Sequence, residues 1–141
     1  KLEIKKSKEQ FEQLQKDNAL IQKHTEKLSE KIGDRSSKLE KKSKTLFQVQ
    51  GKIHTNIKRH EKDIEFYDNN HDCPTCKQAI TSEWKQSQVD EKNIKIGNQK
   101  KNLEEVEAEL TKVNDEIEEV TKIINHITWL KLFIFVQFHS L

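Results

Sequence analysis

The second half of the chain carries an unbroken heptad pattern, and no other sequence feature restricts the fold as strongly. Aliphatic side chains alternate at spacings of three and four residues: Leu103, Val106, Leu110, Val113, Ile117, Val120, Ile124 and Ile127. This spacing places them on one narrow stripe of an α-helix, which a partner helix must cover. We therefore expect a coiled-coil arm over 82–127, with Thr81 or Ser82 capping its start.

A looser heptad pattern occupies residues 1–67. Its apolar residues fall in two heptad positions, one with Ile4, Phe11, Ile32, Leu39, Leu46 and Ile53, the other with Leu14, Ile21, Leu28 and Val49. Ile57 and Ile64 are shifted from this stripe by one residue, which predicts a local change in winding. Gly33 and Gly51 mark candidate bends. We expect a first coiled-coil arm over 1–67.

Composition and charge both favour two long helices that fold back on each other. Hydrophobic residues make up 32% of the chain, which is too few for a large compact core, and charged residues make up 35%, which is too many for one. Three glycines and one proline favour long helices. Residues 1–62 carry 17 Lys/Arg against 9 Asp/Glu, and residues 83–127 carry 7 against 11. The net charge of +2 is too small to indicate strong nucleic-acid binding.

The centre of the chain separates the two arms. A polar run over 68–72 suits a loop, and Pro74 disfavours helix directly after it. We expect an all-α fold, an antiparallel coiled-coil hairpin with its apex at 68–81. A parallel homodimer of two bent chains is the alternative architecture.

Both cysteines lie at this apex, in the sequence Cys73-Pro74-Thr75-Cys76. The Cys-x-x-Cys spacing allows two thiolates to bind one metal ion, but structural Zn²⁺ normally has four ligands. No other pair of ligands is evident, so a second molecule would complete the site. Closely spaced cysteines without a recognisable secretory signal favour a reducing compartment and a metal site. Because the chain contains no Met, we expect it to be part of a longer protein.

Three other interpretations of the cysteines remain open. They could form a thiol redox site, although no βαβ pattern accompanies them. They could belong to a zinc site within one chain, with His71 as a third ligand. Finally, they could be incidental thiols in a metal-free coiled-coil scaffold.

The apex resembles a known family of metal-bridged coiled coils. Cys73-Pro74-Thr75-Cys76, followed by Ile80 and flanked by heptads, is similar to the zinc hook of SMC-like DNA double-strand-break repair ATPases. That family includes the bacterial SbcC type and the ATPase subunit of the recombination endonuclease of tailed phages. The resemblance covers roughly residues 1–127. It implies that Cys73 and Cys76 of each of two chains share one Zn²⁺, giving one Zn²⁺ per homodimer.

The resemblance also implies a tethering function. The chain contains no phosphate-binding G-x-x-x-x-G-K-[ST] loop, so we expect no enzymatic activity and no catalytic residue in this segment. The longer protein would be an ATPase that binds DNA and a nuclease subunit. We expect it inside the cell, in the cytoplasm of a bacterium or phage-infected cell, or in a eukaryotic nucleus, and not on a membrane.

The segment 128–141 departs from the heptad pattern. It is nearly uncharged and gathers Trp129, Phe133, Phe135 and Phe138. Its apolar run is too short to span a membrane. Two interpretations of this segment remain open. It could be an interfacial anchor, which would make this a membrane-associated helical protein, or it could be a buried strand. We treat it as an atypical apolar tail.

Overall fold

The chain folds into two long helices joined by a short loop. The computed structural model describes the backbone of residues 1–139 and the side chains of residues 1–136. Helix α1 spans Leu2–Asn69 and helix α2 spans Ser82–His139. Over the described residues the backbone forms no strand, only an isolated bridge within the loop. The all-α fold expected from the heptads is confirmed.

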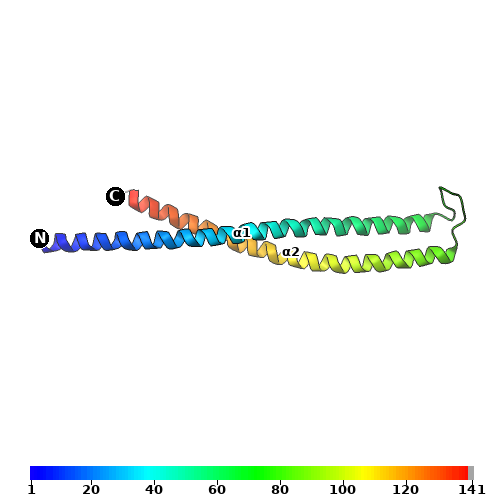
Figure 1. Ribbon diagram of the computed structural model, residues 1–141, viewed down its shortest axis with the longest axis horizontal. Helices are drawn as coiled ribbons and strands as arrows, with labels where there is room; N and C mark the ends of the chain where they lie inside the picture. Colours follow the sequence, from blue (N-terminus) through cyan, green and yellow to red (C-terminus); the bar gives the residue numbers. More distant parts are fainter. Residues whose placement is uncertain (140–141) are drawn as a thin grey trace. The chain divides into compact units, whose positions relative to one another are not determined.

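The two helices pack against each other in two units, which we describe separately. The apex unit is Lys42–Asn114, and the terminal unit combines Lys1–Lys41 with the described residues from Asp115 onward. In the apex unit, α1 and α2 run antiparallel on either side of the loop, as the green and yellow ribbons of Figure 1 show. This unit is the hairpin predicted from the sequence, formed within one chain.

The aliphatic stripe of α2 is confirmed as its packing face. Each of its eight predicted residues is buried or half-buried, and Val113 and Val120 are only 1% and 2% exposed. Burying one valine side chain completely contributes about 2 kcal/mol. In the apex unit the core contains Ile53, Ile57 and Ile96, with Ile64, Leu103 and Val106 packed against them.

The packing face of α1 differs from the prediction in one of its two heptad positions. Starting at residue 25, a stripe of covered side chains alternates at spacings of four and three: Thr25, Ser29, Ile32, Ser36, Leu39, Ser43, Leu46, Gln50, Ile53, Ile57, His60, Ile64 and Tyr67. Asn56 and Asp63, which lie beside this stripe, are also half-buried. The position assigned to Leu14, Ile21, Leu28 and Val49 is wrong, because all four are exposed. Ile57 and Ile64 lie in phase with the covered face, so no change in winding is needed. The first-arm prediction also fails near the N-terminus, where Ile4 and Phe11 are exposed.

Small and polar side chains occupy the position that the apolar pattern missed. Ser43 Oγ lies 3.3 Å from Asn114 Oδ1, and Gln50 Nε2 donates to Glu107 Oε1 at 3.2 Å. An ion pair also joins Lys42 with Glu109 in this unit. In the terminal unit Arg35 pairs with Glu116. These contacts match the opposite charges of the two arms, but exposed pairs contribute only about 0–1 kcal/mol each and mainly select the register.

The tail continues α2 as helix as far as His139, so the alternative of a buried strand is wrong. Exposed apolar side chains recur at helical spacing in Trp129, Leu132, Phe133 and Val136. The rings of Trp129 and Phe133 stack with centroids 5.5 Å apart. None of the described helical stretches combines the length and apolarity needed to cross a bilayer. Residues 140 and 141 of the predicted tail lie outside the described residues, as does the side chain of Phe138.

Both glycines predicted as candidate bends lie inside α1, and neither ends the helix. A Cβ added at Gly51 would meet no atom within 4 Å, and its φ is not positive. Gly51→Ala should therefore raise the free energy of unfolding by about 0.5–1 kcal/mol, because alanine loses less backbone entropy in a helix. Urea denaturation followed by circular dichroism measures the change. A decrease in stability would contradict an open, regular helix at this position.

His60 is a buried polar residue in the seam of the apex unit. It is 8% exposed, and its Nδ1 has no hydrogen-bond partner. Burial lowers the pKa of His60, as do the nearby charges of Lys92, Arg59 and Lys95, whereas Asp63 raises it. The neutral imidazole is therefore the form that the folded hairpin favours.

The lowered pKa of His60 predicts acid destabilisation of the hairpin. The ordinary pKa of histidine is 6.5, so below this pH His60 of the unfolded chain binds a proton that the folded chain resists. The free energy of unfolding therefore falls as pH decreases through the folded-state pKa of His60. His60→Leu should flatten this part of the stability profile. The control is His54→Leu at an exposed position of the same helix. Equal profiles for the two variants between pH 7.5 and 5 would contradict the prediction.

Candidate metal centre at the apex

Side-chain caps end both helices and define the loop between them. Asn70 Nδ2 donates to the carbonyl oxygen of Phe66 at 2.7 Å, which satisfies one of the last carbonyl groups of α1. Thr81 Oγ1 accepts from the amide of Trp84 at 3.4 Å, so the predicted cap at Thr81 is confirmed. The loop therefore covers residues 70–81.

Backbone hydrogen bonds close this loop into a narrow hook. An isolated antiparallel bridge joins Asp72 with Ala79. The amide of Cys73 donates to the carbonyl of Gln78 at 2.8 Å, and the amide of Ile80 donates to the carbonyl of His71 at 2.9 Å. These bonds hold the two ends of the Cys-x-x-Cys segment together.

A tight turn positions the two cysteines within the hook. The amide of Lys77 donates to the carbonyl of Cys73 at 2.7 Å. Lys77 has φ of 58°, a left-handed conformation that is uncommon for a residue with a side chain. Pro74 lacks an N–H group, so this position adds no amide donor that would need a partner inside the turn. The turn reverses the direction of the chain immediately after Cys76.

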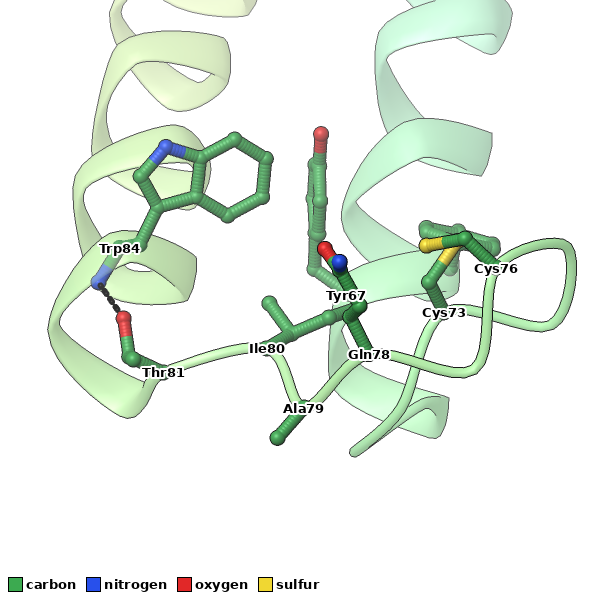
Figure 2. Close-up of a pocket in the computed structure, with 9 residues that line it drawn as sticks. Tyr67, Cys73, Cys76, Gln78, Ala79, Ile80, Thr81 and Trp84 are labelled. Carbon is green, nitrogen blue, oxygen red and sulfur yellow. Dashed lines mark hydrogen bonds between the residues drawn. The ribbon is translucent and has the colours of Figure 1, made fainter.

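The two thiols lie together on this turn and form no disulfide. Cys73 is half-buried and Cys76 is exposed. The sulfur atoms of both residues are drawn on the hook in Figure 2. Backbone N–H groups of Cys76 and then Thr75 donate to the Cys73 sulfur and lower the pKa of its thiol, as does the Cys76 side chain, whereas burial opposes the shift. These donors stabilise a thiolate, which is the form that binds metals.

Aromatic rings support the hook from the ends of both helices. Tyr67 of α1 and Trp84 of α2 meet edge to face, with ring centroids 5.5 Å apart and an interplanar angle of 81°. Phe66 contacts Tyr67 in a similar T-shaped arrangement at 5.5 Å. Tyr67 and Trp84 therefore pack across the neck of the hairpin (Figure 2). A pocket of about 340 Å³ lies beside these rings and includes both cysteines in its wall.

His71 does not join the cysteines. Its Nδ1 lies 3.5 Å from the ammonium group of Lys85. Within the described part of the chain, no group of three or more His, Cys, Asp or Glu side chains is arranged to hold a metal ion. The predicted pair, Cys73 and Cys76, therefore lies together, and among the described residues no third His, Cys, Asp or Glu is arranged with it.

The donor set fits half of a zinc site. Two sulfur ligands with Cys-x-x-Cys spacing and N–H donors directed at one sulfur are the chemistry that tetrahedral Zn²⁺ prefers. A thiol redox motif lies at the start of a helix packed on a sheet, whereas these cysteines lie on a loop. Sequence reasoning missed the left-handed turn at Lys77, because glycine or asparagine usually marks such a position.

Comparison with protein-family models and with curated protein sequences finds no match for this chain.

The left-handed turn predicts how the hook responds to substitution at Lys77. Lys77→Gly should preserve the turn, since glycine adopts positive φ without steric cost, and Lys77→Val should open it, since a β-branched side chain disfavours this conformation. Amide hydrogen exchange at Cys73 and Ile80 measures the change. We expect protection to be kept or increased in the glycine variant and reduced severalfold in the valine variant. Equal protection in the two would show that the turn does not hold the hook closed.

Proposed function

We propose that this chain is a zinc-mediated dimerisation module in which two hooks share one Zn²⁺ through Cys73 and Cys76 of each chain. The observation that carries the proposal is an incomplete but ordered ligand set. Two sulfurs lie on a closed turn at the tip of a hairpin, and the described residues offer no third ligand beside them. Four sulfurs from two chains satisfy the coordination that structural Zn²⁺ requires.

The residues of the chain have distinct tasks in this proposal. The Cys73 and Cys76 thiolates hold the ion, and the Thr75 and Cys76 amides reduce the charge on the Cys73 sulfur. The bridge between Asp72 and Ala79 keeps the two sulfurs together, which lowers the entropy lost on binding. When bound, Zn²⁺ supplies the link that joins two chains.

The resemblance to the zinc hook suggests the wider role. The module would tether two molecules of an SMC-like DNA double-strand-break repair ATPase, and with them the DNA and nuclease subunits that those molecules hold. The hairpin supports a mechanical task for this segment, since Cys73 and Cys76 lie in the loop that joins its two helices. Figure 1 shows this loop between α1 and α2. We propose no catalytic step within these residues.

Metal stoichiometry and solution mass, measured together, test the shared site. The purified chain should contain one Zn²⁺ per two chains and sediment as a dimer. Chelation should return it to monomer without melting the helices, because the seam of each hairpin lies within one chain. Cys73→Ser and Cys76→Ser should each abolish zinc-dependent dimerisation, since each removes two of the four sulfurs.

His71→Ala is the matched control, because His71 lies on the same loop and should leave stoichiometry and mass unchanged. A dimer that forms without zinc would identify a metal-free coiled-coil scaffold. One Zn²⁺ per monomer, lost in the His71 variant, would identify a site completed within one chain. Either result would contradict the proposal.

A further inference from the structure

The pocket beside the two sulfurs has an unusual lining for this chain. Charged residues make up 35% of the sequence, yet the lining contains no Asp, Glu, Lys or Arg. Its apolar side chains come from both helices and the loop, and include Phe66, Ile80 and Trp84. Phe66 is 39% exposed and Trp84 is 49% exposed, so both aromatic rings keep surface that the hairpin does not cover. Figure 2 shows Trp84, Ile80 and the cysteines around this pocket.

We propose that the apolar wall formed by Phe66, Ile80 and Trp84 is the surface on which the hook of a second copy of this chain packs. The inference rests on the proposed shared metal site and identifies the protein contact that accompanies it. It assigns to Phe66 a role in dimerisation that is separate from metal binding.

Sharing the sulfurs brings a second hook close to this wall. Zinc–sulfur bonds are about 2.3 Å long, so sulfurs bound to one tetrahedral ion lie about 3.8 Å apart. The pocket that contains Cys73 and Cys76 also contains the apolar wall. A second hook that brings its sulfurs this close therefore approaches the wall.

The absence of charge on the lining also favours a copy of the same chain. When two identical faces meet across a two-fold axis, each residue of one face lies near the same residue of the other face, or near a neighbour of that residue. A charged lining would bring like charges together, whereas an apolar lining avoids this repulsion and adds buried surface. Exposed aromatic rings near the centre of an interface are the residues that most often dominate binding.

The small size of the tip explains why the apolar wall would contribute to dimerisation. A stable protein–protein interface buries about 1,600 Å² in total. The tip consists of one loop and the ends of two helices, so the protein contact should modulate a dimer that the metal holds. We therefore expect removal of one aromatic side chain to weaken dimerisation and leave the metal stoichiometry unchanged.

The experiment compares Phe66→Ala with Phe47→Ala in the full chain with saturating Zn²⁺. Phe47 also lies on α1 within the apex unit and is 69% exposed, but it does not line the pocket. Sedimentation should show that Phe66→Ala weakens dimerisation about tenfold and that Phe47→Ala leaves it unchanged. Phe66→Leu, which keeps an apolar side chain, should restore most of the affinity.

Two spectroscopic readouts separate the wall from the metal site. The Co²⁺-substituted Phe66→Ala chain should keep the absorption of tetrahedral sulfur coordination. In a Trp129→Phe background, the emission of Trp84 should shift to the blue when Zn²⁺ is added, because a second hook covers the ring. Unchanged emission in a zinc-bound dimer, or equal affinities for the two alanine variants, would overturn the inference and leave the shared site intact. Failure of the unmodified chain to dimerise with Zn²⁺ would instead overturn the proposed function.

Discussion

The structure depends on burial of one aliphatic stripe of α2 against α1. Val113 and Val120 lose nearly all contact with solvent at this seam, although most other side chains of both helices are exposed. A long helix with a polar surface has little tertiary packing to stabilise it unless its apolar stripe is covered. In the apex unit, the seam therefore holds the two helix ends that carry the hook.

The hook is ordered by different forces from those of the seam. Caps at Asn70 and Thr81 end the helices, and hydrogen bonds between short polar segments close the loop. Few side chains are buried there, so the geometry of the two cysteines depends on backbone bonding and on the rings of Tyr67 and Trp84. A tip built this way can present two sulfurs and an apolar wall to a second molecule without contributing to the core.

Much of the fold could be predicted because helical periodicity is a local property. The stripe from Leu103 to Ile127 was predicted residue by residue, since every member is aliphatic. The face of α1 was only half predicted, because Ser29, Ser36 and Ser43 occupy covered positions while Leu28 and Val49 are exposed. A small side chain can fit between close helices, and hydrophobicity alone does not identify it. Pairing with α2 decides which stripe of α1 is covered.

The sequence by itself determined the two arms, the central apex and the two candidate ligands, because spacing and residue type carry that information. Tertiary structure decided the register of the arms, the left-handed turn at Lys77 and the burial of His60. It also decided that Phe66, Ile80 and Trp84 share a pocket with the cysteines. These features arise from contacts between residues distant in sequence, or from a backbone conformation that lysine rarely adopts. Neither of these causes produces a local sequence pattern from which the feature could be predicted.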